Sequence, residues 1–102
     1  MLELRPNCEN CDTDLPPASI HAYICSYECT FCKNCVDTIL KNVCPNCGGG
    51  FTKRPIRPKT ERRDGVSLEH QPASTTRIHT KFNEAEIAEF VETVKDTNLE
   101  ER

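Results

Sequence analysis

The sequence has no long hydrophobic run. No segment approaches the roughly 20 apolar residues that a membrane-spanning helix needs. Met1 is followed by a charged, proline-containing stretch, not by the apolar core of a secretory signal peptide. We therefore expect a cytoplasmic protein whose cysteines stay reduced.

The sequence also lacks the residue arrangements that carry catalysis. It shows no Ser/His/Asp set and no glycine-rich phosphate loop, since three of its four glycines are consecutive at 48–50. We therefore expect a binding protein and not an enzyme.

What the sequence does have is eight cysteines, all in its first half. They fall into three pairs with a two-residue spacer and one pair with a three-residue spacer: Cys8 and Cys11, Cys25 and Cys29, Cys32 and Cys35, Cys44 and Cys47. A two-residue spacer lets both sulfurs face one metal ion, and eight thiolates complete two tetrahedral sites. Closed sites of this kind stabilise a fold and leave no coordination position for chemistry.

Zinc is the metal that this pattern favours, with two Zn²⁺ per chain in structural roles. Domains below about 70 to 80 residues usually need disulfides or metal because their hydrophobic core is small. Disulfides are disfavoured in a reducing cytosol. An iron–sulfur cluster is the other alternative. In the ferredoxin cysteine pattern, three residues separate the third cysteine from a Cys-Pro pair. Here many more residues separate Cys35 from Cys44-Pro45, so the pattern does not fit.

The cysteines can share the metals in two ways. A sequential scheme gives one site Cys8, Cys11, Cys25 and Cys29, and the other Cys32, Cys35, Cys44 and Cys47. An interleaved scheme gives site 1 Cys8, Cys11, Cys32 and Cys35, and site 2 Cys25, Cys29, Cys44 and Cys47. Only two residues separate Cys29 from Cys32, so the sequential scheme would require the chain to change metals within one turn. We prefer the interleaved scheme.

The order and spacing of these ligands resemble the RING finger family. The likeness includes residues between the ligands, namely Phe31, Val36, Leu40 and the Cys44-Pro45-Asn46-Cys47 ending. It implies an all-cysteine cross-brace with a RING-like or treble-clef fold. The stretches from Met1 to Cys8, Asp14 to Pro17 and Arg54 to Pro58 resemble a family of short bacterial proteins of unknown function, family 1272, which implies a bacterial, cytosolic setting and no activity.

The RING resemblance also raises ubiquitin-ligase activity as an alternative function. Ligases of that family contact a conjugating enzyme through an apolar residue between the first two ligands and often use a basic residue after the last. This chain has Glu9-Asn10 and Gly48 at those places. A carboxylate at the centre of an apolar contact is costly to desolvate, so we expect no ligase activity.

The cysteine region, residues 1–54, predicts a small zinc-stabilised α+β domain. Residues 20–25 are rich in β-branched and aromatic side chains and predict a hairpin with residues 29–31, carrying Cys25 and Cys29 on facing strands. A helix over 33–42 would place Val36, Ile39, Leu40 and Val43 on one face. Gly48 to Gly50 predicts a flexible exit, and residues 51–53 a final strand.

The rest of the chain predicts a linker and one helix. Residues 55–82 lack apolar periodicity, and the block 51–82 has a net charge of +5, so we expect a flexible basic linker in which nucleic acid contact is possible. An amphipathic helix follows in 83–98, expected over 84–97, with Asn83 as N-cap, and residues 99–102 form a tail. The apolar stripe of this helix predicts that it docks on residues 1–54 (the head), on a second chain or on a partner. We expect an adaptor or regulatory scaffold that binds an unidentified protein.

Overall fold

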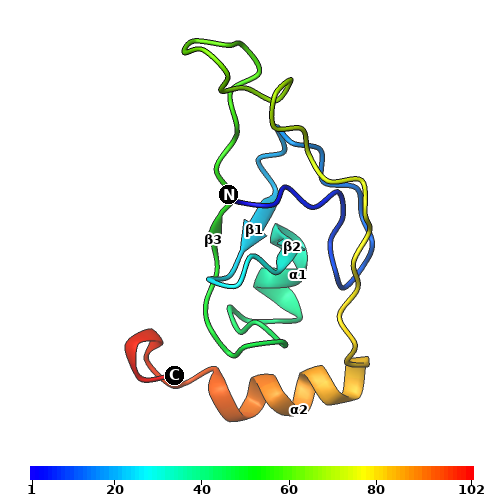
Figure 1. Cartoon of the computed structure of the whole chain (residues 1–102). Coiled ribbons are helices and arrows are strands. Elements are labelled where there is room, and N and C mark those ends of the chain that lie inside the picture. The colour runs from blue at the N-terminus through cyan, green and yellow to red at the C-terminus, as the bar shows by residue number, and fades with distance from the viewer.

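The computed structural model describes residues 1–102 as a small α+β protein. Its three-stranded antiparallel sheet has the order β2-β1-β3, and two α-helices accompany it (Figure 1). The elements are β1 Ala22–Ile24, β2 Thr30–Cys32, α1 Lys33–Thr38, β3 Thr52–Lys53 and α2 Glu84–Val94, with a 3₁₀ helix at Leu99–Glu101. No helix has the length and apolar character needed to cross a membrane.

The predicted hairpin is present as β1 and β2, with Tyr23 opposite Phe31 in the register. The first strand is shorter than expected and the second begins one residue later, so Cys25 and Cys29 lie in the turn that joins them and not on the strands. The Cys25 N–H donates to the Cys29 carbonyl at 3.2 Å, and Glu28 between them has a φ of 66°. The tight turn therefore brings these two cysteines together.

Helix α1 is also shorter than the predicted range of 33–42. Lys41 and Asn42 adopt left-handed φ angles of 47° and 60°, which a continuing α-helix does not allow. The chain therefore folds back after Thr38. This corrects the predicted apolar face, because Leu40 becomes buried while Ile39 remains 41% exposed.

The hydrophobic core is small and rich in sulfur. Six of its 14 buried residues are cysteines. Phe31 and Phe51 make an edge-to-face contact with ring centroids 5.4 Å apart, and Phe51 is only partly buried. A core of this composition has few large apolar side chains, so the arrangement of its sulfurs must contribute much of its stability.

Residues 55–82 leave the sheet after β3, form an outlying loop and return along the N-terminal segment to α2 (Figure 1). The return is fixed by hydrogen bonds to the head: Ser74 N to Leu4 O at 3.0 Å and Thr80 N to Glu9 O at 2.9 Å. The sequence predicted a flexible linker because this segment cannot build a core of its own. In the structure, the returning part of the segment lies against the head through these polar contacts.

Helix α2 begins at the predicted residue and has the predicted capping box, with Asn83 accepting from the Glu86 N–H. It ends at Val94, three residues earlier than expected. Ile87 and Val91 are buried in the core of the head. Of the three places considered for its apolar stripe, the structure shows docking on the head of the same chain.

The glycines at 48–50 form a surface for this docking and not a flexible exit. Gly48 has a φ of 81°, and a Cβ there would lie 3.5 Å from the ring of Phe90. A Cβ on Gly50 would lie 2.6 Å from Leu99 Cδ2. The absence of side chains lets the C-terminal segment approach the backbone closely.

Candidate functional site

The first cysteine group joins the turn at residues 8–11, the N-terminal knuckle, to the start of α1. The sulfurs of its four members all lie within 4.8 Å of one another: Cys8, Cys11, Cys32 and Cys35. The Cys11 and Cys32 sulfurs are 3.7 Å apart. Four sulfurs bound to zinc at about 2.3 Å would be separated by about 3.8 Å, so this distance matches one edge of such a tetrahedron.

Hydrogen-bond donors surround the first group. The Cys35 N–H donates to Cys32 Sγ at 3.5 Å, where Cys32 also caps α1. Asn10 Nδ2 donates to Cys35 Sγ at 3.3 Å. Such donors stabilise thiolates, which are the form of cysteine that binds metal.

The second group joins the β1–β2 turn to the knuckle at residues 44–47, which precedes the glycines at 48–50. The sulfurs of Cys25, Cys44 and Cys47 lie within 4.8 Å of one another. Cys29, the fourth predicted member, is not among the sulfurs that all lie within 4.8 Å of one another, but its thiol influences the pKa of both Cys25 and Cys44, so it lies beside the group. Backbone N–H groups of Tyr27 and Gly49 donate to Cys25 Sγ and Cys47 Sγ, each at 3.4 Å.

The two groups follow the interleaved scheme. The first and third pairs of cysteines meet in one group, and the second and fourth pairs meet in the other. The hairpin explains this arrangement, because its turn carries Cys25 and Cys29 away from Cys32, which lies at the far end of β2 opposite Ala22.

The thiols in each group have divergent pKa values. Hydrogen bonds from Cys29 and Cys44 lower the pKa of Cys25 to about 3, while hydrogen bonds with Cys25 and Cys29, and then burial, raise the pKa of Cys44. Burial is the largest influence on Cys11, but hydrogen bonds from Thr13 and neighbouring thiols outweigh it and lower its pKa to about 7. Burial raises the pKa of Cys8 and of Cys35. Crowded sulfurs therefore resist ionising together unless a cation compensates their charge.

The donor set fits a soft or borderline metal ion. Both groups contain sulfur alone, and each offers enough ligands to close a tetrahedral shell. The structure therefore has two cysteine clusters within metal-binding distance, of the kind that serves structural ions. A closed shell of this kind has no position for a substrate or a reactive water.

Glu9, which stands where the RING resemblance would put a contact with a conjugating enzyme, is an internal residue. It is 3% exposed and pairs with Arg5 at 2.8 Å. Its Oε2 also accepts from the Thr30 N–H at 2.5 Å, and its carbonyl accepts from Thr80. Burial raises its pKa, and the Thr30 N–H and Arg5 oppose that shift.

Arg54 is a buried residue that sequence reasoning missed. It is 2% exposed and donates to three carbonyls, those of Arg5, Leu15 and Pro16, at 2.8 to 3.3 Å. It thereby ties the N-terminal segment and the following loop to the end of β3. A basic run normally indicates a solvated segment, so the sequence held no signal for this burial.

Comparison with known proteins gives a family but no activity. A family model described as "Protein of unknown function (DUF1272)" matches residues 1–57, which include all eight cysteines. "Uncharacterized protein R02474" of Rhizobium meliloti (strain 1021) is 54% identical to the chain over 78 residues, which are 76% of this chain and 86% of that protein. No solved structure matches the chain.

Proposed function

The chain belongs to the DUF1272 family of proteins of unknown function, and because this membership names no activity, we propose that the protein is a zinc-binding protein–protein interaction module. It would serve in the cytoplasm as an adaptor or regulatory scaffold. The observation that carries the proposal is the gathering of four cysteines into one group and three into another, with Cys29 beside the second. Closed metal sites stabilise a surface and do not catalyse.

Zinc is the metal we propose, with one ion in each group and a RING-like cross-brace between them. The 3.7 Å sulfur separation and the backbone N–H donors support this assignment. The cross-brace is supported by the interleaving of the two groups. Arg54 and the buried Glu9 add polar ties between the same segments.

Ubiquitin-ligase activity is the alternative that we do not favour. The knuckle between the first two ligands is closed by the chain itself, because Glu9 is paired internally and the Thr80 N–H donates to its carbonyl. Gly48, after the last ligand, lies against Phe90. Neither position offers the apolar or basic contact that the RING resemblance would require. An autoubiquitination assay with a panel of conjugating enzymes tests this alternative, with no ladder expected.

Nucleic acid binding by the basic segment also receives little support. Arg54 is buried, and Arg57 donates to the carbonyls of Leu2 and Gln71 at 2.6 Å each. Arg77 is occupied by Asp12 and Asp14. These three arginines hold the segment in place and are not free to meet phosphates, which leaves five exposed bases for such contact: Lys53, Lys59, Arg62, Arg63 and Lys81.

Affinity capture from a nuclease-treated bacterial lysate tests the proposed function. The zinc-loaded full chain should retain a discrete protein partner, and the Cys44→Ser variant should lose it, because the ligand surface depends on the metal-stapled fold. The proposal would be wrong if nothing were retained or if retention disappeared with nuclease treatment alone.

A further inference from the structure

Helix α2 and the knuckle at residues 44–47 enclose a surface groove of about 440 Å³. Its eight lining residues are Pro45, Asn46, Phe82, Glu86, Ile87, Glu89, Phe90 and Thr93. Pro45 and Ile87 are buried, whereas Phe82 is partly exposed and Phe90 is 37% exposed. The groove is therefore apolar inside and open to solvent.

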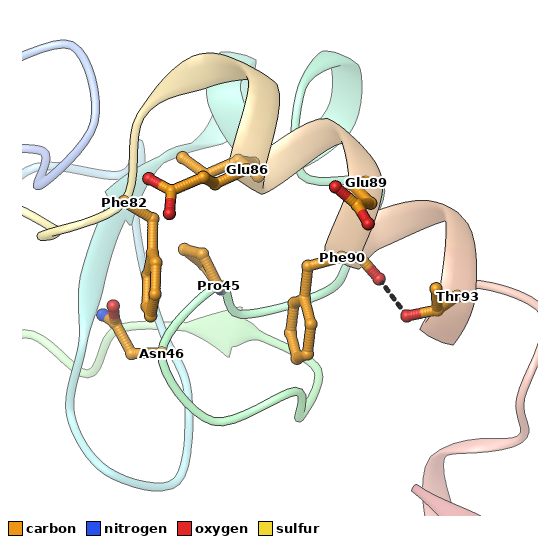
Figure 2. Close-up of a pocket in the computed structure, with 8 residues that line it drawn as sticks. Pro45, Asn46, Phe82, Glu86, Glu89, Phe90 and Thr93 are labelled. Carbon is orange, nitrogen blue, oxygen red and sulfur yellow. Dashed lines mark hydrogen bonds between the residues drawn. The ribbon is translucent and has the colours of Figure 1, made fainter.

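The aromatic side chains give the groove two walls. Figure 2 shows the rings of Phe82 and Phe90 pointing in the same direction on either side of Pro45, with the carboxylates of Glu86 and Glu89 along the helix. Residues 87, 91 and 94 form the face of α2 that covers the head, and residues 86, 90 and 93 form the adjacent face. Phe90 therefore contacts Gly48 of the head and still keeps 37% of its surface exposed at the groove.

The charge around the groove is negative. Glu86 and Glu89 line it, and no lysine or arginine does. Pro45 and Asn46 lie between two cysteines of the second group, and four thiolates around one Zn²⁺ carry a net charge of about −2. At the edge of the groove, Lys81 Nζ lies 5.2 Å from the centroid of the Phe82 ring, so this ring already makes a cation–π contact.

We propose that this groove docks a cationic peptide segment of a partner protein, with an apolar side chain inserted between Phe82 and Phe90 and a lysine or arginine beside Glu89. The inference rests on the proposed function and names the chemistry of its partner. Apolar insertion would supply affinity, and the flanking charges would supply orientation and specificity.

A second copy of the chain fits this groove less well. Residues 83–102 have a net charge of −5, so two copies facing each other across α2 would repel. In the basic stretch after β3, Arg54 is buried and Arg57 is bound to backbone carbonyls, whereas Lys59, Arg62 and Arg63 are exposed. The proposal commits to a segment of a partner protein, and binding of a second copy through these exposed bases is an outcome that the test detects.

The test is an NMR titration of the zinc-loaded full chain with a short amidated peptide that carries two leucines between arginines. We expect saturable shifts of the Asn46, Phe82 and Phe90 amides. A peptide with alanines in place of the leucines keeps the charge and should bind at least about fivefold more weakly. A peptide with glutamates in place of the arginines should show no saturable binding.

The matched variants are Glu89→Lys and Glu92→Lys, which change the net charge equally on one helix. Glu89 lines the groove, whereas Glu92 pairs with Lys95 outside it. Glu89→Lys should weaken the peptide about fivefold or more, and Glu92→Lys less than about twofold. Equal weakening by both variants would show diffuse charge attraction and overturn the proposal.

Three further outcomes would also overturn it. Shifts that map away from the groove would place binding elsewhere, and concentration-dependent shifts of the same amides without peptide would mean that a second copy fills the groove. If the lysate partner were captured equally by wild type and Glu89→Lys while the peptide failed to bind, the interaction module would stand and the groove inference would fall.

Discussion

The two halves of the molecule are ordered by different means. Residues 1–54 contain the sheet, α1 and both cysteine groups, and they supply 12 of the 14 core residues. Residues 55–102 supply two, Ile87 and Val91, with Phe82 and Val94 packed partly buried against the core, and the segment before α2 meets the head through hydrogen bonds. The head is therefore held by its sulfur clusters, while the C-terminal half takes its order from the head.

This difference implies a one-way dependence, in which the C-terminal half needs the folded head but the head does not need the C-terminal half. Loss of the metal sites should disorder the whole chain, because α2 has no other surface to cover its apolar face. Loss of α2 docking should leave the cysteine groups intact, since none of their members lies beyond residue 47. An 11-residue helix is marginal alone in water, so α2 should not persist once released.

Metal removal is the change with the largest expected effect. A strong chelator should unfold residues 1–54 and release α2 with them, because structural zinc contributes on the order of 10 kcal/mol or more in small domains. Far-UV circular dichroism should show loss of both helices in one transition, and added zinc should restore them. Retention of the α2 signal after the head unfolds would break the one-way dependence.

Glu9→Ala should be the most damaging change of a residue that is not a ligand. It removes the partner of Arg5 and leaves the Thr30 N–H buried without an acceptor, so we expect a loss of about 2–4 kcal/mol in the free energy of unfolding. Urea denaturation of the zinc-loaded chain measures it. Glu3→Ala is the control, because Glu3 also pairs with Arg5 but is much more exposed, and it should cost no more than about 0.5 kcal/mol. Equal losses for the two variants would contradict the internal role of Glu9.

Ile87→Ala tests the other half of the comparison. Ile87 is 1% exposed, and its truncation should weaken the docking of α2 by about 2–4 kcal/mol while the head stays folded. Amide exchange should accelerate across residues 84–94 and remain slow in β1 and β2. Val94→Ala, at a partly buried position, should have a smaller effect of about 1 kcal/mol. Accelerated exchange in the strands would mean that the head depends on α2 after all.

Arg77→Ala should have the smallest effect. Arg77 is well exposed and binds Asp12 and Asp14 at 2.9 and 2.8 Å, so solvent and salt screen these pairs. We expect faster exchange near residues 74–80 only, with no change in the midpoint of urea unfolding. Arg62→Ala, at another exposed position, should change neither the exchange rates near residues 74–80 nor the midpoint of urea unfolding. A shifted midpoint for Arg77→Ala would show that the return segment stabilises the head.

The parts of the fold that depend on local or repeated patterns could be predicted from the sequence. The cysteine spacing predicted two groups, and the short connection from Cys29 to Cys32 favoured the interleaved scheme that the sulfur positions follow. Asn83 and Glu86 predicted the start of α2 through a capping box, which needs only residues near one another in the chain.

The parts that the sequence did not predict depend on contacts between distant segments. The return of residues 74–80 along the head uses backbone hydrogen bonds, which leave no periodic trace in the sequence. The burial of Glu9 and Arg54 depends on partners that only the folded chain supplies. The end of α1 depends on left-handed backbone angles at Lys41 and Asn42, which are not glycines and give no clear stop signal.

The metal content of the full chain tests the central claim most directly. Protein expressed without added metal should be analysed by native mass spectrometry and by elemental analysis of the same sample. The account predicts two zinc ions per chain, held by the two groups of four cysteines. One zinc per chain, or iron with visible absorption, would contradict it.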